Sequence, residues 1–289
     1  SDRVWGGLMQ LANWSEQLLR VQQRQGTERF YPALCQLLGQ LQPVDECVVL
    51  LFRPAEPPQL LYQRAPLPGD NFGRYLKSAY VLDPFYRLGL RGSHKGVWRL
   101  SDIAPDNYAE FEQYYNSYFR HLKIQDEVGF IIPLALHQGF VHIELAQIAG
   151  SELFRLDVIA QWQALFCLVE QLVLQQQQLL NNDAIRPHAT GYLVDDFQRC
   201  FGSEVCTRRE RDVLNMMLEG HCVKAIARQL KLGLETVKMH RKNLYAKLGI
   251  SSHPELLALF IELLASSEAP VLRDPLLPVA AAAELKRTG

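Results

Sequence analysis

The sequence predicts two domains of different class: an α+β domain in the N-terminal part and an all-α domain of four helices near the C-terminus. The length of 289 residues suits about two domains. In the first 180 residues, helical patterns stand before and after short apolar runs, with no regular strand–helix–strand alternation. That order is typical of an antiparallel sheet flanked by helices. After residue 206 the apolar residues recur at helical spacing.

The N-terminal domain begins with two predicted helices, over residues 4–24 and 27–41, because leucines recur there on one helical face. Pro43 ends the second helix. The continuous, β-branched apolar run at 47–52 predicts a buried strand, and 60–62 is its expected partner after a turn-rich stretch.

Helical pieces are expected over residues 70–90, with a break at Asp83 and Pro84, since proline disfavours helical backbone at the residue before it. Residues 106–122 predict a helix rich in tyrosine and phenylalanine. These rings are spaced by three and four residues, so they share one helix face, which favours packing in the core. The alternative is that they line a ligand cavity.

Two further strands, over 128–136 and 140–146, are expected to meet at a tight turn at 137–139. The longest periodic segment, 152–180, predicts a long helix that closes the domain. Four consecutive glutamines from Gln175 continue its pattern, so we interpret them as the polar end of this helix.

Changes in composition predict the domain boundaries. The first domain is expected over 1–180 and the helical domain over 204–265. The intervening 181–203 contains proline and glycine with little periodicity, which predicts a linker. The prolines and alanines of 266–289 predict a flexible tail.

The C-terminal domain carries the start and stop signals of four short helices. Thr207 and Glu210 form a capping box, in which each side chain bonds the backbone N–H of the other residue. Gly220 is a stop signal, and a second capping box at Ser252 and Glu255 starts the fourth helix. A three-residue turn separates the second and third helices, expected over 223–230 and 234–248. This is the arrangement of a helix-turn-helix.

The charge of this segment favours binding to phosphates. Residues 206–250 carry ten lysines and arginines against four acids, a net of +6, whereas the whole chain has a net charge of −1. The third helix separates an apolar stripe from a polar face, as a recognition helix needs; an ordinary basic, solvated helix is the alternative. The polar face contains Thr236, Lys238, Met239, Arg241 and Lys242, and the stripe contains Val237, Leu244 and Leu248.

The same segment closely resembles the LuxR-type (NarL or FixJ type) DNA-binding domain over about 60 residues. The matching positions are Thr207-Arg-Arg-Glu210, Val213-Leu214, Gly220, Lys224-Ala-Ile-Ala227, Leu230, Glu235-Thr-Val-Lys238, His240, Asn243-Leu244 and Lys247-Leu-Gly-Ile250. Gly233 departs from the family, which usually has a capping serine there, but glycine is a tolerable cap.

This resemblance implies a four-helix module whose third helix enters the major groove. It implies that Lys238, Met239 and Lys242 lie at base edges, and that Lys224, Thr236 and Arg241 lie nearer the phosphates. It also implies a dimer contact through the fourth helix, whose candidate residues are Leu256, Leu257 and Phe260.

The N-terminal domain is similar to the autoinducer-binding domain of quorum-sensing LuxR proteins, a sensor with a PAS- or GAF-like fold. The similar positions are Tyr75, Asp83-Pro84, Trp98, Gly129, Pro133-Leu134 and Gly139. The resemblance implies that Asp83 accepts a ligand N–H, that Tyr75 donates to a ligand carbonyl, and that Trp98 walls the pocket. The alternative is structural: Asp-Pro is a common turn, and Trp98 can be plain core.

Several other function classes lack their sequence signals. There is no phosphate loop, no receiver-type acidic cluster, no catalytic constellation and no metal-ligand spacing, so we expect neither an enzyme nor a cofactor. The sequence also shows no secretion signal and no continuous apolar run of membrane-spanning length, so we expect a cytoplasmic protein without a membrane contact.

We therefore predict a transcriptional regulator that senses a small-molecule effector and binds double-stranded DNA as a homodimer. RNA polymerase is a further candidate partner. The alternative is that the N-terminal domain is a protein-interaction or enzyme-like module that the helix-turn-helix tethers to DNA.

Overall fold

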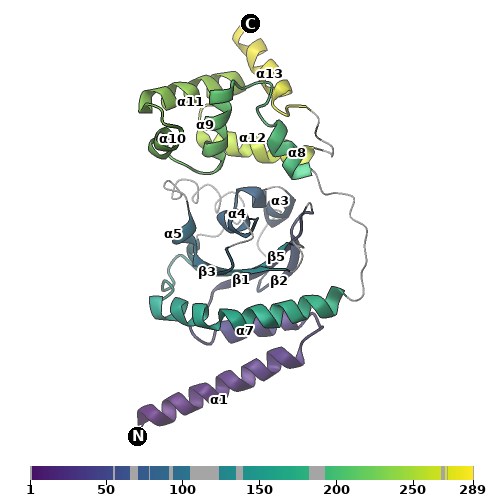
Figure 1. Cartoon of the computed structure of the whole chain (residues 1–289), viewed down its shortest axis with the longest axis vertical. Helices are drawn as coiled ribbons and strands as arrows, with labels where there is room; N and C mark the ends of the chain where they lie inside the picture. Colours follow the sequence, from purple (N-terminus) through teal and green to yellow (C-terminus); the bar gives the residue numbers. More distant parts are fainter. Residues whose placement is uncertain are drawn as a thin grey trace.

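In a computed structural model, the protein is elongated, with an N-terminal part built on a sheet at one end and a C-terminal helical part at the other (Figure 1). It describes residues 2–54, 56–65, 71–77, 79–90, 94–104, 124–134, 139–181, 193–267, 271 and 273–288. The aromatic-rich helix predicted over 106–122 lies outside the described residues, as does most of the turn predicted at 137–139.

One antiparallel sheet forms the centre of the N-terminal part, in the order β2-β1-β5-β4-β3. Its strands are β1 (Glu46–Phe52), β2 (Gln59–Gln63), β3 (Gly96–Arg99), β4 (Ile124–Pro133) and β5 (Phe140–Ile148). The predicted α+β class and antiparallel sheet are confirmed. The sequence did not predict β3, because a four-residue strand that starts with glycine carries no alternation to detect.

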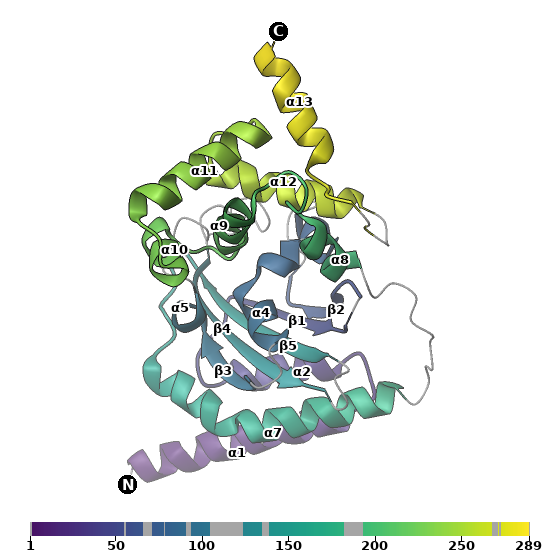
Figure 2. The ribbon, with the colours of Figure 1, turned by 45° about the horizontal axis from the view of Figure 1, so that its top comes forward.

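Helices α1 (Asp2–Gln23), α2 (Phe30–Leu38) and α7 (Leu156–Asn181) lie on one side of the sheet (Figures 1 and 2). Trp162 of α7 is fully buried in this layer and donates its indole N–H to Leu38 O at 3.2 Å. The glutamine tract does continue α7, and two of its side chains are buried. Gln176 accepts from Gly26 N, and Gln177 donates to the Tyr31 hydroxyl. The tract therefore ties α7 to the first helices.

By length and composition alone, the stretch Leu156–Leu180 could cross a membrane. The helices α11 (Leu234–Leu248) and α12 (His253–Ser266) would pass the same test as a pair bent by 50°. This is weak support for a membrane span, because the core helix of a protein in water passes the same test. Here the inner face of α7, with Val158, Trp162 and Val173, is buried against the sheet. We interpret α7 as such a core helix.

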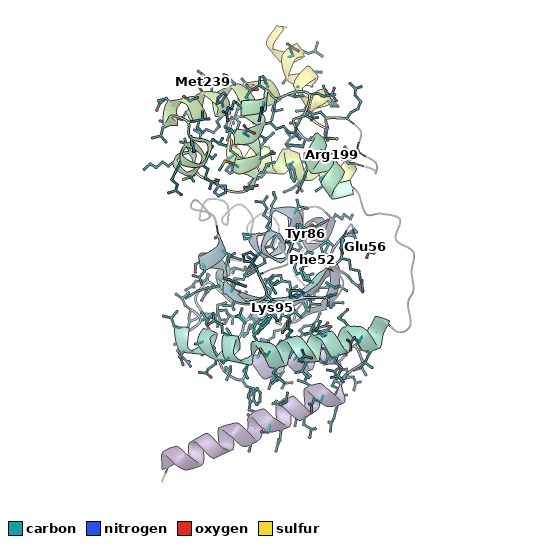
Figure 3. The ribbon with its side chains drawn as sticks, in the orientation of Figure 1. Phe52, Glu56, Tyr86, Lys95, Arg199 and Met239 are labelled. Atoms are coloured by element: carbon teal, nitrogen blue, oxygen red, sulfur yellow. The ribbon has the colours of Figure 1, made fainter. Side chains whose placement is uncertain are left out.

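The opposite face of the sheet is covered by α3 (Asn71–Lys77), the 3-10 helix η1 (Ala79–Leu82), α4 (Pro84–Leu90) and α5 (Leu100–Ile103) (Figure 2). The helical pieces break at Asp83 and Pro84 as predicted. The packing is close, since a side-chain carbon at Gly129 would lie only 2.4 Å from Phe85 and 2.6 Å from His142. Phe52 of β1 and Tyr86 of α4 face each other in this layer, with ring centroids 5.1 Å apart (Figure 3).

In the C-terminal part, the residues that the structure describes form helices and connecting turns. The four predicted helices are confirmed as α9 (Arg208–Leu218), α10 (Val223–Leu230), α11 (Leu234–Leu248) and α12 (His253–Ser266). Two more helices, α8 (Leu193–Cys200) and α13 (Leu277–Thr288), lie in the ranges where we expected a linker and a flexible tail.

The tail is held by one buried carboxylate. Asp274 accepts four backbone N–H groups at 2.9–3.0 Å, three of them from the loop between α8 and α9. The donors are Gly202, Glu204, Val205 and Leu276. Beyond it, α13 lies against α11, with Ala283 next to Gly249. The described residues of this stretch thus pack on the C-terminal part, and their composition gave no sign of this contact.

Candidate DNA-binding surface and sensor core

The start of α9 is built by the predicted capping box. Thr207 Oγ1 accepts from Glu210 N at 3.3 Å, and Glu210 Oε2 accepts from Thr207 N at 2.8 Å. The same carboxylate lies 2.6 Å from Lys247 Nζ in the last turn of α11. Burial alone would raise the pKa of Glu210, but the bonds from Lys247 and Thr207 outweigh it and hold that pKa below its ordinary value. One carboxylate therefore joins the first helix of the domain to the recognition helix.

The helix α10 ends on a residue with left-handed backbone, a common way for a helix to stop. Lys231 has φ 53°, and Gly233 stands at the N-cap of α11 without a side-chain cap. Val237, Leu244 and Leu248 are buried as predicted, so the opposite face of α11 is turned outwards.

The predicted DNA-contact residues lie on that outer face and at the start of α10. Lys224, Lys238, Met239 and Lys242 are exposed, whereas Thr236 and Arg241 are half-buried. Figure 3 shows Met239 on α11, at the far side of the C-terminal part from the sheet.

Lys238 already has a neighbour of opposite charge, because its Nζ lies 2.7 Å from Glu235 Oε1. Both side chains are more than half exposed, and such a pair contributes only about 0–1 kcal/mol. Lys238 can therefore exchange this partner for a base edge at small cost.

The residues predicted for the dimer contact occupy a different place. Leu256, Leu257 and Phe260 are at most 2% exposed within the single chain. Phe260 packs edge-to-face against Phe197 of α8 and Phe201. In the single chain the apolar face of the fourth helix therefore packs on the core of its own domain, and the dimer contact through these three residues stays a prediction. Dimerisation itself stays a prediction.

In the N-terminal part the structure brings two of the three predicted ligand residues together. Tyr75 is fully buried and donates its hydroxyl to Asp83 Oδ2 at 2.7 Å. Asp83 Oδ1 accepts from Phe85 N at 2.8 Å and so caps the start of α4. Asp83 therefore caps a turn, and its contact with a ligand stays a prediction. While this bond lasts, the single Tyr75 proton is committed to Asp83, and Tyr75 cannot also donate to a ligand carbonyl.

The third residue, Trp98, stands at the edge of the sheet on β3, opposite Gly129 on β4. Its indole Nε1 lies close to Gly96, and its ring is 6.3 Å from that of His94. It shares the α4 side of the sheet with the Tyr75–Asp83 pair.

Sequence reasoning missed the polar residues on this apolar face. His142 and Glu144 of β5 are fully buried there, and the His142 ring lies 4.6 Å from that of Phe85. Both residues belong to a strand whose other residues are mostly apolar. Because side chains two positions apart lie on the same face of a strand, their spacing could have placed both on the α4 side of the sheet. Among the residues that the structure describes, no three His, Cys, Asp or Glu side chains are placed to hold a metal ion together.

The comparisons with known proteins support the assignment of the helical domain as a DNA-binding domain. Residues 204–260 match the family model described as bacterial regulatory proteins, luxR family. The chain is 31% identical over 200 residues to a putative HTH-type transcriptional regulator in the exeN 3' region of Aeromonas salmonicida. That match covers 67% of this chain and 100% of the relative. The transcriptional regulatory protein UhpA of Escherichia coli strain K12 is 41% identical over 78 residues, 25% of this chain and 40% of that protein.

Two solved structures resemble the chain more loosely. The VqsR LBD domain of Pseudomonas aeruginosa matches with 29% identity and a TM-score of 0.49, over 58% of this chain and 98% of that one. SdiA of Escherichia coli matches with 17% identity and a TM-score of 0.43, over 91% of this chain and 99% of that one.

The family model accounts for the helix-turn-helix, and the Aeromonas regulator is matched over its whole length. The predicted LuxR-type resemblance is confirmed, and the chain is a DNA-binding transcriptional regulator that belongs to the LuxR family of bacterial regulatory proteins.

Proposed function

We propose that this regulator binds operator DNA as a homodimer through α11, under the control of a small molecule bound by its N-terminal part. The observation that carries the DNA half of the proposal is the exposed, basic outer face of α11, held in place by a fully buried inner stripe. Long donors on a rigid helix are what base edges and phosphates in the major groove require.

Within this surface we assign Lys238, Met239 and Lys242 to base edges, and Lys224, Thr236 and Arg241 to phosphates. Lys238 and Lys242 lie one turn apart and are both exposed, so they reach the same groove. The half-buried Thr236 and Arg241 lie at the margin of the helix face, which suits contacts to the backbone of the duplex.

For sensing, we assign Tyr75, Asp83 and Trp98 to the effector region, between the sheet and α3 and α4. A buried carboxylate bonded to a buried hydroxyl offers an acceptor pair that a donor-bearing ligand can engage. The proposed units are 1–180 for sensing and dimerisation, 181–203 for the linker, 204–265 for DNA binding and 266–289 for the tail. A regulator of this kind acts where the DNA is, so we place it in the cytoplasm.

The direct experiment is a thermal-shift screen of the full chain against acyl-homoserine lactones and small metabolites. A ligand that binds the folded state raises the melting temperature by mass action. For any hit, Asp83→Asn should move the dose-response to higher concentration, whereas Lys242→Ala, on the DNA side, should leave it unchanged. A library without a single stabilising compound would favour a protein-interaction role for the N-terminal part.

A further inference from the structure

The last carbonyl of α9 is satisfied from outside the C-terminal part. A helix leaves its final four carbonyls without partners inside the helix. In α9 the chain itself serves three of them: Asn215 O accepts from Glu219 N, Met216 O from His221 N, and Met217 O from Gly220 N. The fourth carbonyl, Leu218 O, accepts at 3.0 Å from the Arg87 guanidinium of α4, which belongs to the N-terminal part.

The charge of Arg87 suits this position. The C-terminus of a helix carries a partial negative charge, which a cation stabilises. His253 approaches the same turn, with its Nε2 at 2.9 Å from Met217 O. A carbonyl can only accept, so Nε2 of His253 carries the hydrogen. The end of α9 is therefore held by backbone donors and by two side-chain donors, one from its own domain and one from the sheet domain.

Arg87 is also tied to the sensor core. Its Nε donates to Val81 O at 3.1 Å, and its backbone N–H donates to Asp83 O at 3.1 Å. Asp83 is the residue whose carboxylate takes the Tyr75 hydroxyl and caps α4. One turn of α4 thus separates the buried Tyr75–Asp83 pair from the contact with α9.

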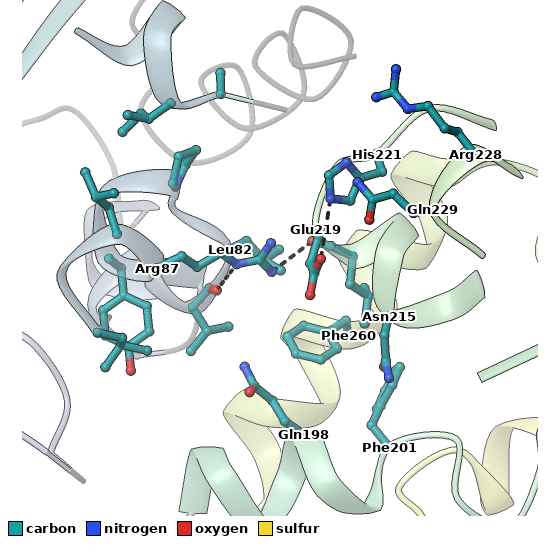
Figure 4. A pocket seen from close by; sticks show the side chains of 18 residues that line it. Leu82, Arg87, Gln198, Phe201, Asn215, Glu219, His221, Arg228, Gln229 and Phe260 are labelled. Atoms are coloured by element: carbon teal, nitrogen blue, oxygen red, sulfur yellow. Dashed lines mark hydrogen bonds and ion pairs between the residues drawn. The ribbon is translucent and has the colours of Figure 1, made fainter. Parts of the chain in front are cut away.

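The contact lies in a shared cavity. A space of about 690 Å³ is lined from both parts, with Leu82 and Arg87 on one side and Phe201, Leu218 and Phe260 on the other. Figure 4 shows Arg87 reaching across this space toward the end of α9, where Glu219 and His221 lie. Directly after this turn, α10 begins at Val223, followed by Lys224.

We propose that Arg87 is a positioning residue that couples the sensor to the DNA-binding domain by capping the end of α9. A displacement at Asp83 moves Arg87 on the same helical turn, and Arg87 transmits it to the turn from which α10 and Lys224 start. The regulatory consequence rests on the proposed sensing function, but the contact and its test need no ligand.

The test is hydrogen exchange on the full chain, read at the Gly220 and His221 amides that close α9. Loss of the cap in Arg87→Ala should speed their exchange about tenfold, since a hydrogen bond from a charged donor no longer opposes opening of the turn. Arg87→Lys keeps the charge, but its single ammonium group cannot replace the planar guanidinium that bonds both Val81 O and Leu218 O. This variant should give an intermediate exchange rate. As a matched control, Arg64 donates to the Val44 carbonyl within the sheet domain, and Arg64→Ala should leave the α9 amides unchanged.

A double-mutant cycle separates coupling from a merely structural role. Tyr75→Phe should change exchange at Gly220 and His221 when Arg87 is present, and should have no effect there in the Arg87→Ala background. Asp83→Asn provides a second perturbation if Tyr75→Phe unfolds the sensor. Equal effects of the sensor variants with and without Arg87 would overturn the proposal, as would unchanged exchange in Arg87→Ala. A failed ligand screen would leave these results untouched.

Discussion

Glu210 Oε2 lies 2.6 Å from Lys247 Nζ, and this ion pair joins the first turn of α9 to the last turn of α11. Lys247 also donates to Val205 O, in the loop that Asp274 holds. The position of the recognition helix thus depends on one buried carboxylate and, through the loop, on the tail.

Glu210→Gln should destabilise the helical domain by about 1.5–3 kcal/mol, because a buried charged hydrogen bond is lost. Denaturant unfolding checks this. Arg209→Ala removes an exposed pair with Asp212 from the same helix and should cost less than about 1 kcal/mol. If both variants lowered the free energy of unfolding by the same amount, the Glu210–Lys247 pair would contribute no more to stability than an exposed ion pair.

Acid should weaken the same domain. The pKa of Glu210 is lower in the folded chain than its ordinary value. The stabilisation is therefore fully present above that ordinary value and is lost as the pH falls through the folded pKa. The stability difference between wild type and Glu210→Gln, measured from pH 7 downwards, should shrink in this window. A constant difference would argue against a titrating Glu210.

Asp274→Ala should loosen the loop between α8 and α9, because four backbone N–H groups lose their acceptor. We expect faster amide exchange at Gly202, Glu204 and Val205 and a destabilisation of about 1–3 kcal/mol. Arg273→Ala, next to it and largely exposed, is the control. Unchanged exchange in Asp274→Ala would mean that the tail is not anchored in solution.

Leu257→Asp should unfold the helical domain, rather than merely weaken a dimer. Leu257 is 2% exposed in the single chain, and an unpaired charge there costs several kcal/mol. Circular dichroism of the variant should show lost helix, whereas Glu262→Gln, exposed on the same helix, should retain it. A folded, monomeric Leu257→Asp would support the dimer role of this residue.

The helical domain could be predicted closely because its signals are local. The capping box at Thr207, the stop at Gly220 and the apolar stripe of α11 each lie within a few residues of the element they specify. The residues that join elements far apart in the chain gave no such signal. Asp274 bonds Gly202 across 72 positions, and Arg87 bonds Leu218 across 131.

The sensor part was predicted in class and in most of its strands, but only partly in its site. The family resemblance predicted Tyr75 and Asp83 as site residues, and in the structure the two side chains form a hydrogen bond. It did not reveal that the two side chains bond each other, because side-chain direction depends on the break at Pro84 and on packing over Gly129. His142 and Glu144 were hidden by the apolar residues around them in β5.

The most direct measurement of the central claim is the salt dependence of duplex binding by the wild-type chain and Lys238→Ala. If α11 reads the groove, affinity for a cognate site should fall steeply with salt as counterions are released, and Lys238→Ala should cost about 1–3 kcal/mol and relax the sequence preference. Glu262→Gln, on the fourth helix, should bind as wild type does. Equal affinity and equal preference of Lys238→Ala and wild type at matched salt would contradict the assignment of α11 as the recognition helix.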